Sequence, residues 1–318
     1  MSHHIRKNLL LSLFCCLILL LQAAEPVDSL QTTHKSASTP RHLSLSAELA
    51  MRPGGDYRVE QEGESVELGR NDLYTKASVR ASMPIYQNGS TLISSSLRYT
   101  HIHQHFNPEV QLLDYGFGAT AHHIFAANIM GMGKVKLGRK SLMLMGMVSG
   151  ECSQYGLERW TAIGTAVLML KETRRTQFGI GVLGMVNTLS KIPVFPFFTY
   201  RHTFNEQWMV NLVLPNLQVR YTLSPSDFIS LGMSIDADHY FIHPNTKGLP
   251  DRVRYSRCVQ NFGPIFEHRF ASGLSLTVDM GLSMLMADRV HKSGGSTKIA
   301  EVHEKAVPYG KVTIQKRF

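Results

Sequence analysis

Long segments in which apolar and polar residues alternate recur along this chain. Between residues 73 and 86, Leu73, Val79 and Ile85 share one face, whereas Lys76 and Arg80 lie on the other. The same period of two recurs in segments 43–51, 228–238 and 274–286. Such alternation predicts strands with one apolar face. The segments exceed the about five or six residues usual in soluble sheets and suit the about 9 to 11 residues that a tilted strand needs to cross a bilayer.

The connections between these segments alternate between short and long. Short turns are predicted at residues 87–90, 138–140, 171–176, 205–207, 224–227 and 271–273. Longer links are predicted at residues 53–71, 104–114, 151–158, 188–193, 243–251 and 289–305. Outer-membrane barrels have short turns on one side of the membrane and longer loops on the other. The sequence therefore predicts an all-β fold, a transmembrane antiparallel up-and-down β-barrel.

Aromatic residues gather near both ends of the predicted strands. Those beside short turns or at the C-terminus are Tyr86, Phe178, Phe204, Trp208, Phe228, Phe270 and Phe318. Those toward the longer links are Tyr99, Tyr115, Trp160, Tyr240 and Phe241. Two such groups are typical of the aromatic belts at the two interfaces of a membrane barrel.

The number of strands depends on the segment 209–223. As one strand it gives 13 strands and leaves the C-terminus on the wrong side of the membrane. As two short strands that turn at Pro215 and Asn216 it gives 14, and proline is tolerated at strand ends. We predict 14 strands, with 12 as the alternative.

The N-terminus predicts export. Arg6 and Lys7 precede an apolar run at 9–21, and the small residues Ala23 and Ala24 follow it. This is the order of a secretory signal peptide, and the run is shorter than the about 20 residues of a membrane-spanning helix. We assign residues 1–24 to the signal peptide, 25–41 to a disordered segment and 42–318 to a barrel in the outer membrane of a Gram-negative bacterium.

The charge and the cysteines exclude little. Removal of Arg6 and Lys7 with the signal peptide lowers the formal charge from +9 to +7. The basic residues are scattered and form no basic-aromatic patch, so we expect outer-membrane lipids and not nucleic acid as partners. Cys152 and Cys258 are the cysteines of the mature chain. One pair does not make a disulfide scaffold, and whether the two are bonded stays open.

The last residues, VTIQKRF, place Val312, Ile314 and Phe318 on one face. This ending resembles the C-terminal strand by which outer-membrane barrels are recognised by the barrel-assembly machinery, and the resemblance implies that machinery as a partner. Lys316 departs from the pattern because an apolar residue is expected there, but its stem can lie along the apolar surface with the charge in water.

A second resemblance covers residues 195–232, FPFFTYRHTFNEQWMVNLVLPNLQVRYTLSPSDFISLG. An aromatic-rich strand, a short turn, Trp208, LVLP and RYTLSP in this order resemble an uncharacterised outer-membrane β-barrel family of Bacteroidetes-type bacteria, known as a domain of unknown function. The resemblance implies the fold and the membrane. It implies no activity and no catalytic residues.

Two groups of residues, one of histidines and one of methionines, are candidates for chemistry. His101, His103 and His105 share a strand face and could ligate a metal, although a solvated segment at the outer rim is the simpler interpretation. The methionines Met130, Met132, Met143, Met145 and Met147 could suggest a path for soft metals. The simpler interpretation is that the alternating residues Met143, Met145 and Met147 form a row that faces lipid. A lipid-modifying enzyme would need a nucleophile with a base, and no G-x-S-x-G motif occurs. We expect no cofactor.

Charged residues on the polar faces are the most informative about function. The predicted lumen-lining residues are Lys76, Arg80, Arg98, Arg220, Asp236, Asp238 and Asp279. If paired, they brace a closed barrel; if unpaired, the cations favour anionic solutes. Nearby Gly179, Gly181 and Gly232 are expected to leave room for water. We therefore predict a conduit for small polar or anionic solutes. The alternatives are a closed barrel for structure or interaction and, third, a lipid-modifying enzyme.

Overall fold

The computed structural model describes residues 43–61, 64–111, 119–153, 156–187, 194–213, 216–242, 253–292 and 298–318. The predicted segments 1–24 and 25–41 lie outside this part. All regular structure in it is β-strand, and no helix of the described residues is long and apolar enough to cross a membrane. The strands are β1 (Ser44–Arg52), β2 (Asp56–Gln61), β3 (Glu64–Asn71), β4 (Tyr74–Gln87), β5 (Thr91–Gln111), β6 (Ala119–Leu137), β7 (Lys140–Ser153), β8 (Gly156–Glu172), β9 (Thr176–Asn187), β10 (Val194–Thr203), β11 (Trp208–Val213), β12 (Asn216–Thr222), β13 (Asp227–Ile242), β14 (Val253–Arg269), β15 (Leu274–Lys292), β16 (Lys298–Glu304) and β17 (Val307–Arg317).

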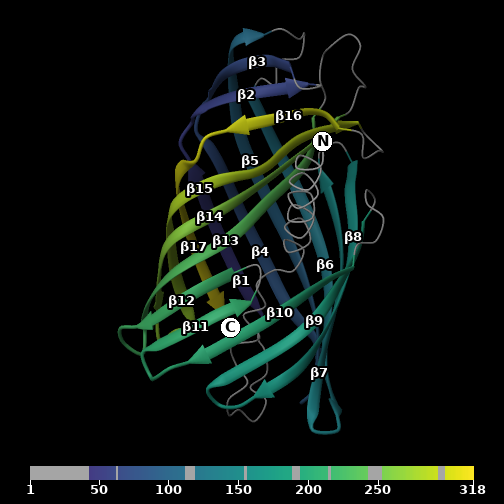
Figure 1. Ribbon diagram of the computed structural model, residues 1–318, viewed down its shortest axis with the longest axis vertical. Coiled ribbons are helices and arrows are strands. Elements are labelled where there is room, and N and C mark those ends of the chain that lie inside the picture. The colour runs from purple at the N-terminus through teal and green to yellow at the C-terminus, as the bar shows by residue number, and fades with distance from the viewer. Residues whose placement is uncertain are drawn as a thin grey trace, which may run out of the picture.

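The strands close into an antiparallel barrel (Figure 1). Consecutive strands pair from β4 to β15, β17 pairs with β15, and β1 pairs with both β17 and β4. The ring of β1, β4 to β15 and β17 has fourteen strands, so the prediction of 14 is confirmed. Val213 pairs with Asn216, which makes 208–222 two strands, as expected. The termini of the barrel meet where the Phe318 amide donates to the Leu43 carbonyl at 2.9 Å.

Three strands continue the barrel beyond this ring. After short breaks at 53–55, 72–73 and 305–306, β2, β3 and β16 carry on from β1, β4 and β17. They connect β15 to β5 through the pairs β15–β16, β16–β2, β2–β3 and β3–β5. Figure 1 shows them across the upper end of the barrel. We call β2, β3 and β16 the rim extension.

The rim extension corrects the prediction of long loops at 53–71 and 289–305. These segments are charged on the outside, where Arg58 pairs with Glu60 at 2.7 Å, so they resemble loops in sequence. Their inward residues Tyr57 and Val59 are 3% and 1% exposed, which gives the hairpin a buried face. Strands that leave the lipid no longer need an apolar outer face, and the alternation is therefore weaker there.

The other predicted links are shorter than expected for the same reason. β5 runs on to Gln111, and β7 and β8 leave only residues 154–155 between them, which corrects the loops at 104–114 and 151–158. Links 188–193 and 243–251 lie outside the described residues.

The predicted short turns all connect neighbouring strands, within a residue or two of the expected bounds. Side-chain oxygens fix several of them. Asn88 Oδ1 accepts from the amides of Ser90 and Thr91 at 3.0 and 2.7 Å, and Asn205 Oδ1 accepts in the same way from Gln207 and Trp208. Such turns satisfy the backbone groups that a strand end leaves unpaired.

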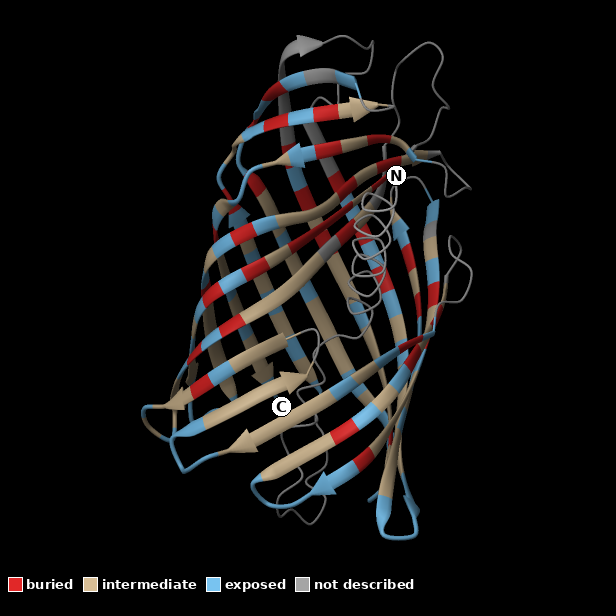
Figure 2. Ribbon diagram, viewed as in Figure 1, coloured by how far each residue is buried: buried red, intermediate tan, exposed pale blue. Residues whose placement is uncertain are grey.

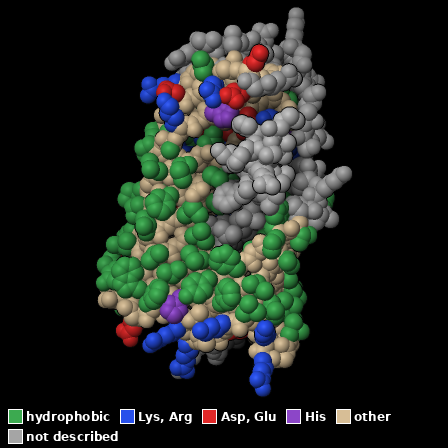
Figure 3. All heavy atoms as spheres, viewed as in Figure 1, with side chains coloured by type: hydrophobic (Ala, Val, Ile, Leu, Met, Phe, Trp, Pro, Cys, Tyr) green, Lys and Arg blue, Asp and Glu red, His purple; other side chains and the backbone are tan. Residues whose placement is uncertain are grey.

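The outside of the barrel carries the apolar faces. Leu97, Val79 and Ile129 are 67%, 55% and 58% exposed, and buried or half-buried residues alternate with such positions along the strands (Figure 2). Figure 3 shows hydrophobic side chains over the middle of the barrel and charged ones toward its ends. This is the outer surface of a membrane barrel, in which lipid covers the apolar belt.

Most aromatic residues of the short-turn end lie on this outer surface, including Phe204, Trp208, Phe270 and Phe318. Phe228 does not belong to the belt, which corrects its predicted place there. Its ring lies 3.8 Å from the buried Arg220 guanidinium carbon and 4.6 Å from that of Arg269. Its position next to a turn suited a belt residue, but strand register turns the ring toward the cations.

The backbones of β14 and β15 approach closely at two glycines. A Cβ on Gly263 would lie 1.9 Å from the Met280 carbonyl oxygen, and one on Gly281 would lie 2.1 Å from the Phe262 oxygen. Only glycine, which has no Cβ, fits where these two neighbouring strands approach so closely.

We expect Gly263→Ala to separate β14 from β15 and to lower the free energy of unfolding by about 1–3 kcal/mol, the usual cost of overpacking. Urea unfolding followed by tryptophan fluorescence measures it. Gly131→Ala is the control, since a Cβ there meets open space. Equal stability of the two variants would contradict the close approach.

Candidate functional site

The candidate site is the interior of the barrel. On each strand, the inward positions are those between the exposed apolar positions. All seven predicted lumen residues occupy inward positions: Lys76, Arg80, Arg98, Arg220, Asp236, Asp238 and Asp279. Their alternation with lipid-facing residues places them there, because successive side chains of a strand point to opposite faces.

One ion-pair group crosses the interior. Lys76 Nζ on β4 lies 2.9 Å from Asp236 Oδ1 and 2.7 Å from Asp238 Oδ1 on β13. The Tyr74 hydroxyl donates to Asp238 Oδ2 at 2.6 Å. In the sheet, β14, β15, β17 and β1 separate these strands, a path of about 24 Å at about 4.8 Å per strand. The contact therefore spans the lumen, and we call Lys76, Asp236 and Asp238 the lumen bridge.

Other predicted charges pair along the wall. Arg98 lies 3.2 Å from Glu151 Oε1, and Arg159 lies 2.8 Å from Glu151 Oε2. Arg220 pairs with Glu267 at 3.1 Å.

Asp279 has two partners on the last strand. Lys311 Nζ lies 3.4 Å from its carboxylate, and the Tyr309 hydroxyl donates to it. The partners of Arg98, Arg220 and Asp279 were not predicted from the sequence. Glu151 lies in a segment that was interpreted as a loop. Glu267, Lys311 and Tyr309 lie at inward positions of alternating segments, and this position is the signal that could have identified them.

Above the lumen bridge, apolar side chains fill the interior. Ile102 and Tyr255 are 0% exposed. They belong to one buried cluster, which we call the upper core: Tyr57, Val59, Tyr74, Ile102, Ile124, Tyr255, Val290, Ala300 and Val302. Its residues come from the rim extension and from the ring, so the upper core joins the two parts.

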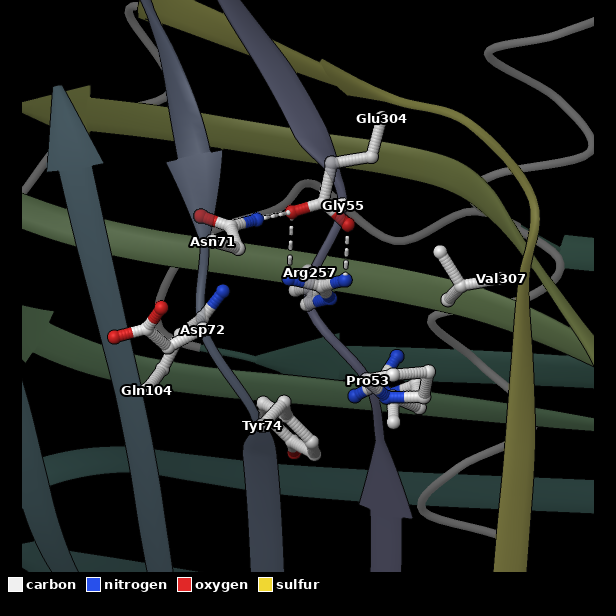
Figure 4. Close-up of a pocket in the computed structure, with 10 residues that line it drawn as sticks. Pro53, Gly55, Asn71, Asp72, Tyr74, Gln104, Arg257, Glu304 and Val307 are labelled. Carbon is white, nitrogen blue, oxygen red and sulfur yellow. Dashed lines mark hydrogen bonds and ion pairs between the residues drawn. The ribbon is translucent and has the colours of Figure 1, made fainter. Parts of the chain in front are cut away.

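Buried charges lie where the rim extension meets the ring. Arg257 is 2.5 Å from Glu304, and Asn71 also donates to Glu304 (Figure 4). Arg257 also lies 3.7 Å from Asp288. The guanidinium carbon of Arg52 lies 3.9 Å from the centre of the Tyr74 ring. These contacts connect residues beside the three breaks, which separate β1 from β2, β3 from β4, and β16 from β17.

On one side of the interior, small polar residues line the wall formed by β1, β4, β5, β15 and β17 toward the short-turn end. Ser44, Ser78 and Thr313 are representative, and none of them is buried. The row consists of Ser44, Ser46, Ser78, Ser82, Ser94, Ser96, Thr277, Thr313 and Gln315. Side chains this short cannot fill the lumen of a fourteen-stranded barrel, which is wider than the about eight-stranded barrels that side chains fill. We call this part the polar mouth.

The methionine row corrects one expectation. Met143, Met145 and Met147 lie at inward positions and not toward lipid: Leu144 and Val148 between them are 41% and 57% exposed, and Met147 is 7% exposed. Apolar residues occur on both faces of β7, so alternation alone chose the wrong face.

The expectation that Gly179, Gly181 and Gly232 leave room for water is also wrong. A Cβ on Gly179 would lie 2.8 Å from Val167 Cγ1, and one on Gly181 would lie 3.0 Å from Phe197 Cε1. At Gly232 it would lie 3.1 Å from Ile265 Cδ1. These glycines make room for neighbouring side chains and leave none for water.

The histidines lie on the outer face near the rim. His101 and His123 face each other with ring centres 4.8 Å apart, and the Tyr99 hydroxyl contacts His123 Nδ1 at 2.7 Å. His103 is exposed, and the side chain of His105 lies outside the described part. Among the residues that were described, no group of three or more His, Cys, Asp or Glu is placed to hold a metal.

Cys152 is exposed and Cys258 buried, and both are free thiols. Val312, Ile314 and Phe318 are 39%, 47% and 55% exposed on the outer face. Lys316 Nζ donates to the Ser272 carbonyl at 2.5 Å, which keeps its charge at the end of the barrel.

No family model matches this chain, and no curated protein matches it. Among solved structures it is similar to an outer membrane channel from Pseudomonas putida F1, with 10% identity, 90% of this chain and 100% of the other covered, and a TM-score of 0.47. It is also similar to a Pseudomonas aeruginosa FadL homologue (10% identity, 87% and 89% covered, TM-score 0.40). A third similar structure is the P. putida toluene transporter TodX, with 8% identity, 88% of this chain and 91% of the other covered, and a TM-score of 0.36. At these values, the fold assignment rests on the strand pairing of this chain itself.

Loss of the Lys76 charge should destabilise the barrel. Lys76→Met leaves two carboxylates facing each other without a cation, and breaking a buried pair on one side costs about 3–5 kcal/mol. Urea unfolding measures this loss, and Lys76→Met combined with Asp236→Asn and Asp238→Asn should recover part of it. Arg58→Met is the control, because an exposed pair such as Arg58–Glu60 contributes less than about 1 kcal/mol. Similar losses for the two methionine variants would show that the lumen bridge is not a buried ion pair.

Proposed function

We propose that this protein is an outer-membrane conduit for small polar or anionic solutes. The observation that carries the proposal is the polar mouth, a partly exposed lining of serine and threonine inside a barrel whose outside is apolar. A barrel that only braces the membrane gains nothing from an accessible polar interior, whereas a solute path requires one.

The lumen bridge and the upper core define where passage is controlled. The carboxylates and Lys76 meet across the lumen, and the apolar cluster lies above them. A solute from the polar mouth has to pass this level, so passage requires the bridge to open. Paired cations select less strongly for anions than free ones. Glu151 is shared between Arg98 and Arg159, so a substitution of Arg98 changes the charge of this group in the wall.

Single-channel recording tests the conduit. The chain without residues 1–24, refolded in detergent and added to a planar bilayer, should give stepwise openings. Arg98→Glu places a carboxylate beside Glu151 and should shift selectivity toward cations, whereas Arg58→Glu on the outer surface should not.

A folded barrel that stays silent would contradict the conduit and favour the closed structural barrel. Altered lipid composition on overexpression, abolished by a single Ser or His substitution, would favour the lipid-modifying enzyme.

We also propose that the barrel-assembly machinery binds the C-terminal face formed by Val312, Ile314 and Phe318. Phe318 is 55% exposed, so Phe318→Ala should refold in detergent like the parent, and it keeps the backbone bond to Leu43. In cells it should lower the amount of heat-modifiable barrel in the outer membrane. Leu223→Ala, a second exposed apolar residue near a short turn, is the control. Unchanged assembly of Phe318→Ala would contradict this role.

A further inference from the structure

Methionines are concentrated on the inward face of one hairpin. Five of the fifteen methionines of the chain lie there, on β6 and β7: Met130, Met132, Met143, Met145 and Met147. Met130 is directly opposite Met147, and Met132 is directly opposite Met145. These four form a two-by-two block, which we call the thioether block.

The strand geometry lets the sulfurs of the block converge. Residues directly opposite on antiparallel strands have Cβ atoms about 4.5–5.5 Å apart, and diagonal neighbours are about 7–8 Å apart. A methionine side chain has three rotatable bonds and adapts its end to such distances. Four thioethers can therefore reach one ion between the two strands.

The residues paired with the block are neutral: Leu92 and Ser94 on β5 and Ile163 and Thr165 on β8. The carboxylate of Glu172 lies at the end of the methionine row, where Lys134 holds it at 2.5 Å. Hard cations require carboxylate or carbonyl oxygen, and zinc prefers thiolate and imidazole. Neutral thioethers select soft ions such as Cu(I). A single positive charge also costs less to desolvate than two.

The block continues into the apolar wall of β8 to β10, where Met147 and Met130 pack with Ile163, Leu183, Met185, Phe195 and Phe197. The upper core, by contrast, consists of Tyr, Val, Ile and Ala and contains no methionine. Met147 is buried, but Met130, Met132 and Met145 are half-buried, so one side of the block is accessible. Gly179 and Gly181 nearby are covered by side chains, which leaves an apolar solute little room at that wall. A bare ion needs much less space.

We propose that the thioether block binds a soft monovalent metal ion, Cu(I) or Ag(I), inside the barrel. The proposal does not depend on the conduit function. It is distinct from a site at the outer histidines, because thioethers carry no proton that a metal must displace and their affinity does not change with pH.

Silver(I) is the probe, because it stays monovalent in air. The chain without residues 1–24 is refolded in detergent with Cys152→Ser and Cys258→Ala, since both free thiols would bind silver, and it is titrated calorimetrically in nitrate buffer without chloride. One ion per barrel should bind, with the same affinity between about pH 5 and 8. If Cys258→Ala prevents folding, Cys152→Ser alone serves as the background, because the comparison of methionine pairs below still decides.

Met145→Leu with Met147→Leu removes two sulfurs at nearly constant volume and should weaken silver binding by about tenfold or more. Met280→Leu with Met284→Leu, on the lipid-facing side at 53% and 38% exposure, is the matched control and should change it little. The proposal is overturned if the parent binds no silver, if the control pair loses as much, or if acid abolishes binding. It also fails if the inward leucine pair binds like the parent, which would make the block a packing surface only.

Discussion

Backbone hydrogen bonding in lipid is the constraint on which this structure depends. A strand inside a bilayer has no water to satisfy its amides and carbonyls, so a membrane sheet has to close on itself. Here the closure is made by β1, which pairs with β17 from Ser44 to Met51 and with β4 on its other side. With the sheet closed, every strand has one face toward lipid and one toward the lumen, and all further features follow from that division.

The lumen contains three distinct environments. Beneath the upper core, small polar residues line one wall toward the short-turn end, methionine, leucine and phenylalanine line the wall of β6 to β10, and paired charges lie between β4, β13, β15 and β17. Charges removed from water are tolerated when they are paired and hydrogen-bonded, and the lumen bridge meets that condition through residues far apart in sequence. Lys76 and Asp236, 160 positions apart, are the clearest case.

The rim extension shows why the sequence understated the strands. Below the rim, lipid imposes apolar residues at every second position, and the period of two is plain in segments such as 73–86. Above it, water and neighbouring charges meet the outer face, as at Arg58, Glu60 and His303. Only the inward residues keep their pattern, and Tyr57 and Val59 alone are too few to distinguish a strand from a loop.

The sequence by itself determined the strands that cross the lipid, their number, the short turns and the positions of the charged inward residues. These features are local, because alternation, turn chemistry and length act within a few residues. The tertiary structure decided which inward residues meet, that glycines 179 and 181 are covered, and that the methionine row faces the lumen. Contacts across a lumen depend on barrel closure and on the register of every strand in the ring, and no local pattern contains that information.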